Sequence, residues 1–427
     1  MSLPVHFKHI TASKNKVLQR LALLRTDKQT RLKEGHVLVQ GLKTIEELAN
    51  KGHVFRTIGI TFDENNLPIR SPALEVVRQS LQDHDPGENN SKTKFQSTLS
   101  TSTSTAKGRG PKLQANHYVA TSRLATTRIL GTDSPVAEHE VWAEVRIPDH
   151  RHFFSLNICP DQDLSTSSTA TTTAQQDSIS GKPSTSKTIE RMLVLDRITD
   201  PGNMGLMIRA AKALDWDASW HTPGTVDQYN SKVVRASRAL CLDWPSRTAD
   251  QGPLSRPLNK TRVMSSMLAP AGWTELELFL AQRRMTLVVA DMLPTGISGR
   301  LAQTFLKEPS LRSSESQRGS QSEDSRATVN PYELVWWNWP ASLSQRQVPS
   351  RIALVLSSEH HGVKSRQQDE QDQEAKRRLF ERAIRVSIPM RPEVESMNVS
   401  TAATTMMWEL NKLIARHDLI PQIIDTE

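Results

Sequence analysis

The sequence predicts an α/β protein with two folded units. Short apolar runs alternate with segments whose apolar residues have helical spacing, which is typical of a mostly parallel sheet covered by helices on both faces. With 427 residues, the chain is long enough for two or three domains. Hydrophobic residues make up 37% of it, below the roughly 45–50% usual in globular domains. Part of the chain is therefore expected to lie outside any core.

The larger unit is expected over residues 189–420. Its apolar runs predict strands at Met192–Leu195, Leu287–Ala290, Ile352–Leu356 and Ile384–Ile388, and helices from Gly202 to Leu214 and from Ser396 to about Arg416. Ligands of parallel sheets bind in the loops at the carboxyl ends of the strands. Functional residues are therefore expected just after these strands.

A smaller α/β unit is expected over residues 1–155. Its strands are predicted at Val37–Val39, Thr57–Thr61 and Val141–Ile147, with a helix at Thr44–Asn50. From Lys8 to Lys33 there are eight lysines and arginines and one acid. Such a helical segment is either a solvated surface or a surface that contacts phosphates.

Two serine- and threonine-rich tracts cannot build a core. Eight of nine residues are Ser or Thr from Ser97 to Thr105 and again from Ser165 to Thr173. Such tracts bury too little apolar surface to offset the ordering of the backbone. We expect a disordered insertion at about 83–112, a disordered linker at 156–188, and loop expansions at about 308–330 and 364–378.

Composition also limits the function classes. The net charge of +8 weakly favours a polyanionic partner. No apolar run approaches the roughly 20 residues of a membrane helix, so no membrane partner is expected. Two cysteines exclude a disulfide scaffold. Residues 1–26 lack acids and resemble a transit peptide, so the location is expected to be mitochondrial or cytoplasmic.

The first polar turn follows the strand at Met192–Leu195 and leads into a helix. Its proline, glycines and asparagine either make a tight turn or expose backbone N–H groups to an anion. Arg209 lies about one helical turn beyond Gly205, and the Gly-Lys-Ser/Thr of a P-loop is missing. The turn reads Asp200-Pro201-Gly202-Asn203-Met204-Gly205.

The second turn follows the strand at Ile352–Leu356. Its Glu359 is either a backbone cap or a functional carboxylate. Adjacent histidines suggest a metal, but catalytic zinc usually has three protein ligands and no matching cluster occurs elsewhere, so no metal is expected. The turn reads Ser357-Ser358-Glu359-His360-His361-Gly362.

The third turn follows the strand at Ile384–Ile388 and is broken by prolines. Ser396 is expected to begin a helix whose first turn exposes Asn398; alternatively, Ser396 is simply the helix N-cap. The two conspicuous parts of this turn are Ile388-Pro389-Met390 and Ser396-Met397-Asn398-Val399-Ser400.

In this order, the three turns resemble the motifs of the SpoU (TrmH-type) branch of the SPOUT RNA methyltransferases. The first motif matches through Asn203, Gly205 and Arg209, and the third matches with Met397 in place of leucine. The second keeps Glu359 and Gly362 but departs elsewhere. In it, Ser357 and His360 stand where glycine is usual. A common intermotif sequence is matched by Val233-Val234-Arg235-Ala236-Ser237.

The N-terminal unit carries a second resemblance. Residues 10–17 and Val37-Leu38-Val39-Gln40-Gly41 resemble the L30-like substrate-binding domain of rRNA-directed SpoU enzymes, with Gln40 in place of a usual glutamate. The unit is therefore expected to bind the RNA substrate. The tryptophans Trp336, Trp337 and Trp339 could stack bases, but burial in the core or a dimer interface is expected instead.

The resemblance implies an S-adenosylmethionine-dependent RNA ribose 2′-O-methyltransferase. It implies a parallel sheet with a trefoil knot, a homodimer, and a structured RNA substrate, rRNA rather than tRNA. The transit-peptide-like composition of residues 1–26 makes mitochondrial ribosomes a candidate source of that rRNA. A catalytically inactive, knotted RNA-binding or ribosome-assembly factor is the alternative. The implied catalytic residues are Asn203, Arg209, Glu359, Ser396 and Asn398, and the implied cofactor-binding residues are Ser357, Gly362, Ile388, Met390 and Met397.

Overall fold

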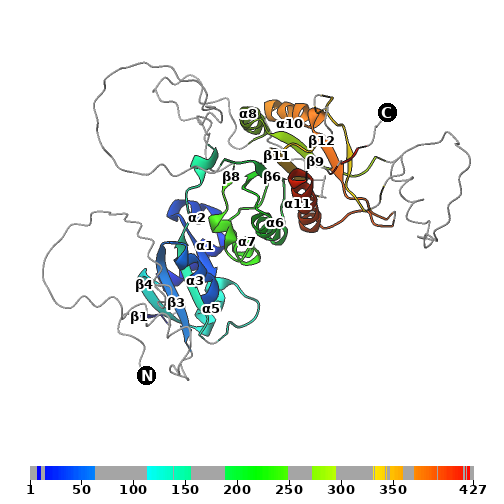
Figure 1. Ribbon diagram of the computed structural model, residues 1–427. Helices are drawn as coiled ribbons and strands as arrows, with labels where there is room; N and C mark the ends of the chain where they lie inside the picture. The colour runs from blue at the N-terminus through cyan, green and yellow to red at the C-terminus, as the bar shows by residue number, and fades with distance from the viewer. Residues whose placement is uncertain are drawn as a thin grey trace, which may run out of the picture. The chain divides into compact units, whose positions relative to one another are not determined.

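The computed structural model divides the chain into two compact units (Figure 1). The N-terminal unit comprises Met1–Pro148 and Asp227–Asp243, and the C-terminal unit comprises Asp149–Val226 and Trp244–Glu427. The structure describes residues 7–10, 15–62, 113–137, 139–154, 188–248, 272–294, 330, 332–341, 343, 347–358, 370–391, 393–416, 419 and 421–423.

The unit boundary differs from the prediction in one segment. Residues 227–243, which we call the strap, were expected in the C-terminal unit but cluster with the N-terminal one. Ion pairs hold both ends of the strap in that unit, because Asp227 pairs with Arg31 and Asp243 pairs with Lys51. The stretches 83–112, 156–188 and 308–330 lie almost wholly outside the described residues, so the predictions made for them stay predictions.

The N-terminal unit is built on a five-stranded mixed sheet in the order β1-β4-β3-β5-β2. β1, β4 and β3 are parallel, whereas β5 is antiparallel to both of its neighbours, β3 and β2. The strands are β1 (Phe7–Ile10), β2 (His36–Gln40), β3 (Phe55–Phe62), β4 (Ala115–Ser122) and β5 (Val141–Arg146).

Helices cover this sheet because their apolar residues recur at helical spacing. α1 buries Leu18, Leu21 and Leu24 in a cluster with Trp142 of β5. Trp142 lies so close to Gly59 of β3 that a Cβ at position 59 would come within 2.1 Å of its ring. The helices are α1 (Lys16–Thr26), α2 (Lys28–Glu34), α3 (Leu42–Asn50), α5 (Arg123–Leu130) and, in the strap, α7 (Ser231–Ala236) followed by the 3-10 turn η2 (Leu240–Asp243).

The C-terminal unit contains an eight-stranded sheet in the order β13-β10-β12-β9-β11-β6-β7-β8. The six strands from β12 to β8 are parallel, which confirms the predicted parallel α/β sheet, but β10 runs antiparallel to β12. The strands are β6 (Arg191–Asp196), β7 (Ala218–His221), β8 (Ser246–Thr248), β9 (Thr286–Ala290), β10 (Val335–Trp337), β11 (Ile352–Ser357), β12 (Ile384–Ser387) and β13 (Gln422–Ile423). The trefoil knot implied by the resemblance stays a prediction.

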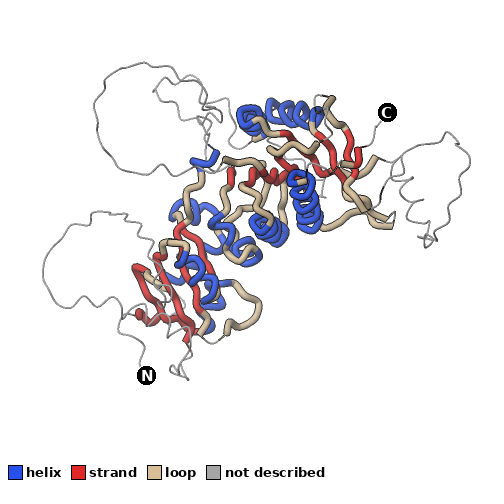
Figure 2. The backbone as a smooth tube through the Cα atoms, in the orientation of Figure 1, coloured by secondary structure: helices blue, strands red, loops and turns tan. Residues whose placement is uncertain are grey.

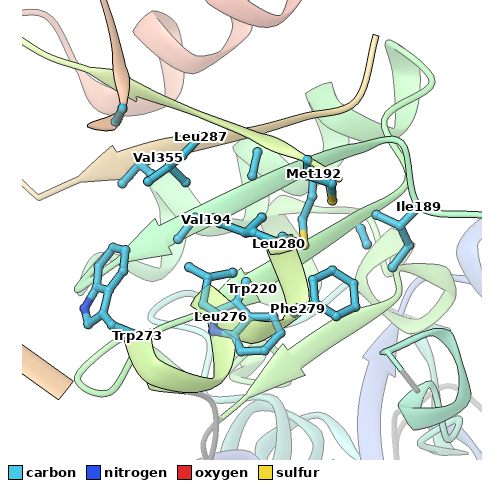
Figure 3. Close-up of a cluster of buried hydrophobic side chains, with 14 of the residues drawn as sticks. Ile189, Met192, Val194, Trp220, Trp273, Leu276, Phe279, Leu280, Leu287 and Val355 are labelled. Carbon is cyan, nitrogen blue, oxygen red and sulfur yellow. The ribbon is translucent and has the colours of Figure 1, made fainter. Parts of the chain in front are cut away.

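Helices lie on both faces of this sheet, with α8 and α10 on one and α6 and α11 on the other (Figures 1 and 2). Figure 3 shows Trp273, Leu276 and Phe279 of α8 among strand residues such as Trp220 and Val355. The helices are α6 (Pro201–Ala213), α8 (Trp273–Arg283), α10 (Glu370–Arg382) and α11 (Val399–Ala415), and the 3-10 turn η1 spans Arg151–Phe154. None of the described helices is long and apolar enough to cross a membrane.

The structure bears on two predictions for this unit, one for the stretch 364–378 and one for the tryptophans of β10. The stretch 364–378 was expected to be a loop, but α10 occupies it from Glu370 onwards. Its charges pair along the helix, and its buried Ala375 joins the core, so a mostly polar sequence still gains a packed face. Trp336 and Trp337 are buried in β10, so core burial accounts for them and base stacking does not.

Candidate functional site

A cavity of about 530 Å³ lies at the carboxyl edge of the parallel sheet of the C-terminal unit. Its walls come from the segments that follow β9, β11 and β12, as expected for a ligand site of a parallel sheet. The lining residues are Ala290, Asp291, Met292, Leu356, Ser357, Ser358, Ser387, Ile388, Met390, Glu395, Ser396, Met397, Val399, Ala402 and Met406.

Four of the predicted cofactor-binding residues, Ser357, Ile388, Met390 and Met397, line this cavity, as does the predicted catalytic Ser396. The second and third motifs are therefore brought together although about 30 residues separate their sequences. Glu359, His360 and Gly362 lie outside the described residues, so their roles stay predictions.

Asp196 fixes the turn that follows β11. Its carboxylate accepts hydrogen bonds from Lys376 Nζ (2.8 Å), Thr222 Oγ1 (2.9 Å) and Ser357 Oγ (3.4 Å), and its backbone oxygen accepts from Ser358 N–H. The second motif is thus tied to the end of β6 and to α10. The sequence marks Asp196 as a strand end, but nothing in it identifies Lys376 as its partner.

Asn398, rather than Ser396, caps α11. The helix begins at Val399, and Asn398 Oδ1 accepts hydrogen bonds from the N–H of Ser400 (2.9 Å) and from its Oγ (2.6 Å). The prediction that Ser396 begins this helix was therefore wrong. An asparagine oxygen accepts hydrogen bonds from the free N–H groups of a first turn as well as a serine oxygen does. Because Asn398 is the cap, Ser396 does not serve as one, and it lies exposed beside the cavity.

The first and third motifs meet through a side-chain hydrogen bond. Asn398 Nδ2 donates to Asn203 Oδ1 at 3.0 Å, which joins the cap of α11 to the first turn of α6. Asp200 caps α6 by accepting from the N–H of Asn203 at 2.7 Å, and Pro201 occupies a first-turn position where no N–H is needed. Two residues predicted to act together are thus in contact, 195 positions apart in sequence.

Arg209 is exposed on α6, and its side chain makes no hydrogen bond or ion pair with any other described residue. It is not among the residues that line the cavity. The guanidinium is therefore free to engage a ligand from solvent, and the catalytic role that the resemblance implies for Arg209 stays a prediction.

The sequence analysis missed Asp291 and Glu395, the two carboxylates that line the cavity. Asp291 directly follows β9 and pairs with Arg385 of β12. An acid at the end of a buried strand is the signal that could have identified it. Glu395 lies next to Ser396 and carries no motif signal of its own.

Metal and thiol chemistry find no support in the described residues. These contain no group of three or more His, Cys, Asp and Glu side chains that could hold a metal ion. Cys241 is buried in the strap, and burial raises the pKa of its thiol to about 12. A thiol with that pKa stays protonated and unreactive at neutral pH.

Sequence comparisons match a short part of the chain to each of two methyltransferases, whereas no protein-family model matches it. The chain is 41% identical over 51 residues to the 23S rRNA (guanosine(2553)-2′-O)-methyltransferase RlmP of Bacillus subtilis, a match of 12% of this chain and 21% of that protein. It is 38% identical over 61 residues to a protein of Synechocystis named as an uncharacterized tRNA/rRNA methyltransferase, covering 14% of this chain and 22% of that one. The chain thus spans about a fifth of the length of the curated relatives it matches.

Solved structures align over most of the chain at low identity. The SpoU methyltransferase AviRb of Streptomyces viridochromogenes, in complex with AdoMet, covers 93% of this chain and 98% of its own, with 16% identity and a TM-score of 0.47. An AdoMet-bound rRNA methyltransferase of Sinorhizobium meliloti covers 95% and 98%, with 15% identity and a TM-score of 0.48. At these scores the alignments add no argument of their own. By its three ordered motifs and its sequence matches, the chain resembles the SpoU RNA methyltransferases.

Proposed function

We propose that the protein is an S-adenosylmethionine-dependent RNA ribose 2′-O-methyltransferase. The observation that carries this proposal is the contact between Asn203 and Asn398, which joins the first and third motifs beside the cavity. The second motif reaches the same cavity through Ser357. Three turns from distant parts of the chain therefore supply one site.

The cavity fits the proposed cofactor by size and by the chemistry of its walls. Its volume of about 530 Å³ lies within the roughly 300–1,000 Å³ of small-molecule sites. The apolar side chains of Ile388, Met397 and Met406 offer a surface for an adenine ring. The carboxylates of Asp291 and Glu395 can accept hydrogen bonds from ribose hydroxyls or an ammonium group.

The chain's own residues would prepare the acceptor ribose. A 2′-hydroxyl is a poor nucleophile, so its proton must be shared and its oxygen held in line with the group it attacks. The cofactor supplies an electrophilic methyl group. The Ser396 hydroxyl and the exposed Asn398 amide, which lie beside the cavity and at the cap of α11, can hold the ribose. A guanidinium donates hydrogen bonds and accepts none, so Arg209 binds the RNA phosphate and does not act as a base.

Ribosomal RNA is the substrate class that we propose. The B. subtilis relative is named for 23S rRNA, and the net charge of +8 suits a polyanion. The proposal extends to mitochondrial ribosomes only through the acid-free composition of residues 1–26. β1 (Phe7–Ile10) and α1 belong to the folded N-terminal unit, and Ile10 packs in its core with three leucines of α1, so a removable leader would have to end before Phe7.

We also propose a homodimer formed by the C-terminal unit. Leu206 of α6 and Trp408 of α11 are 47% and 57% exposed, and these two helices pack against each other. Two large apolar side chains on neighbouring helices favour coverage by a second copy. A monomeric mass measured by light scattering at micromolar protein concentration would contradict this assignment.

The activity is tested in two steps on the full chain. Calorimetry with S-adenosylmethionine should detect one site per chain, and labelled cofactor should then transfer methyl to total rRNA at a ribose position found by mapping. RNA binding without cofactor binding or transfer would instead establish the catalytically inactive alternative. If the labelled methyl group is found on bases rather than on riboses, the 2′-oxygen is not the acceptor.

A further inference from the structure

A second cavity, of about 360 Å³, lies within the N-terminal unit and is separate from the proposed active site. It is lined by Gln40 and Gly41 after β2, by Glu140 before β5, and by Arg235 and Arg238 of the strap. Both sequence segments that the proposed function leaves unused, 37–41 and 233–237, thus border one cavity. All three segments belong to the part of the chain that the structure describes, so the side chains that form the cavity wall are placed.

The strap is held in place from both ends. Arg31 donates to the Asp227 carboxylate through Nε (3.0 Å) and Nη2 (2.6 Å), and Arg31 itself is 3% exposed. At the other end, Asp243 pairs with Lys51 and His53, each at 2.6 Å. The strap wall of the cavity is therefore fixed before any ligand arrives.

Arg235 and Arg238 have no partner among the described residues. Both are exposed, and neither makes a hydrogen bond or ion pair with another described side chain. The strap's acids at its two ends are engaged by Arg31, Lys51 and His53, so they do not pair with these two guanidiniums.

The backbone at this mouth is strained. Arg238 and Ala239 are consecutive residues with left-handed φ values of 53° and 59°. Such a conformation costs a non-glycine residue about 1 kcal/mol or more, and it persists mainly where a functional geometry requires it. Opposite them, Gly41 has φ 94°, which leaves the cavity free of a side chain at that point.

The floor of the cavity offers a donor and an acceptor side by side. The Gln40 amide and the Glu140 carboxyl both line this cavity, and both residues are half-buried. Burial raises the pKa of Glu140, and the Gln40 amide partly offsets this. An amide next to a carboxyl can match the hydrogen-bonding edge of a nucleobase, as such side chains do in base recognition.

We propose that this cavity binds one unpaired nucleotide of the RNA substrate, with its phosphate on Arg235 and Arg238 and its base edge on Gln40 and Glu140. The inference rests on the proposed function for the identity of the polymer. Paired guanidiniums suit a phosphate because their planar forks donate two parallel hydrogen bonds. A cavity of about 360 Å³ also lies at the low end of small-ligand sites, in the range of a single nucleotide.

The phosphate contact is tested by fluorescence anisotropy with a short, 5′-fluorescein-labelled, single-stranded RNA. The full-length double variant Arg235→Ala/Arg238→Ala should bind roughly tenfold or more weakly than the parent chain. The slope of log affinity against log salt should become shallower by about 0.7, the value for one lost phosphate contact on a single strand. Lys232→Ala, an exposed cation of the same helix that does not line the cavity, is the matched control and should change neither value.

The base contact is tested with a run of uridines that carries A, C, G or U at its centre. Gln40→Ala should change the ratio of affinities among these four RNAs by roughly 5- to 100-fold, the range of one base-specific contact. Ratios that stay within about twofold of the parent chain would overturn base recognition. A double arginine variant that keeps its affinity and salt slope would overturn the phosphate site.

Two further measurements separate this inference from the proposed function. Cofactor binding by calorimetry and the melting temperature should be unchanged in all three variants, since the cavity lies in the N-terminal unit and both arginines are exposed. If the parent chain transfers no methyl but the double variant loses RNA affinity, the nucleotide site stands and the enzymatic function fails. If the parent chain transfers methyl but none of the three variants changes the RNA affinity, the enzymatic function stands and the nucleotide site fails.

Discussion

Arginines of the N-terminal helices and the arginine of α6 serve different purposes, although all lie on helices and look alike in sequence. In the N-terminal unit, Arg20 donates to both oxygens of Glu144, at 2.7 and 2.8 Å, and Arg31 is buried against Asp227. In the C-terminal unit, Arg209 is exposed and has no partner among the described residues. The first two hold the fold together, whereas the third is available to a ligand.

This difference shows why a count of basic residues is a poor guide to a nucleic-acid surface. The segment from Lys8 to Lys33 was interpreted as either a solvated or a phosphate-contacting surface, and two of its eight cations are instead occupied by internal carboxylates. A guanidinium paired with a buried carboxylate cannot also neutralise a phosphate without leaving that carboxylate unpaired. The charge available to RNA is therefore decided by pairing.

The largest expected effect comes from breaking the most buried pair. Arg31→Ala should lower the free energy of unfolding of the N-terminal unit by about 3–5 kcal/mol, because it removes the cation paired with Asp227 and the donor to two backbone carbonyls. The exposed Lys33 on the same helix is the control, and Lys33→Ala should stay within about 0.5 kcal/mol. If urea titrations give the two variants equal changes in the free energy of unfolding, the distinction between paired and unpaired cations is contradicted.

Arg209→Ala should do the opposite, reducing activity and leaving stability intact. The loss of one positioned cationic donor should slow single-turnover methyl transfer by roughly 10²–10³-fold, with unchanged cofactor affinity. Arg209→Lys should be nearly as slow, because lysine keeps the charge but loses the bidentate fork. Retention of more than about half the parent rate by Arg209→Ala would contradict the role given to this residue, and Lys412→Ala on α11 is the control.

The strap anchor should make stability depend on acid pH. Burial alone would raise the pKa of Asp243, but the hydrogen bonds from His53 and Lys51 outweigh it and hold this pKa well below its ordinary value. A carboxyl with a lowered folded-state pKa contributes stability above its unfolded pKa of about 4, and this contribution is lost as the pH falls below that value. The melting-temperature difference between the parent chain and Asp243→Asn should therefore shrink as the pH falls below about 4. A difference that grows below about pH 4 would exclude this anchor.

The smallest expected effect is a gain. Ala239→Gly replaces a buried alanine at φ 59° with a residue that adopts the left-handed region freely, so the N-terminal unit should become more stable by about 0.5–1 kcal/mol. A loss of stability measured by thermal melting would show that the alanine methyl group contributes more by packing than its conformation costs.

The sequence by itself determined the α/β class, most of the elements and the parts of the site that lie on one motif. The run Met192–Leu195 predicts β6, and Ile388, Met390, Ser396 and Met397 reach one cavity as their motif implies. These features follow from local periodicity and turn chemistry, which a single segment carries. The resemblance of the N-terminal unit to an L30-like domain and the knot stay predictions of the same origin.

Only the tertiary structure decided which distant groups became partners. It placed the strap with the N-terminal unit, joined Asn203 to Asn398, and gave Asp196 the amine of Lys376, 180 residues away. It also made α10 a helix in a stretch whose composition predicts a loop. The physical reason is that a charge or an amide has no intrinsic partner in sequence. Its partner is whichever group packing brings within hydrogen-bond distance. Once the pair is buried, separating it costs free energy, because each group would be left without a partner.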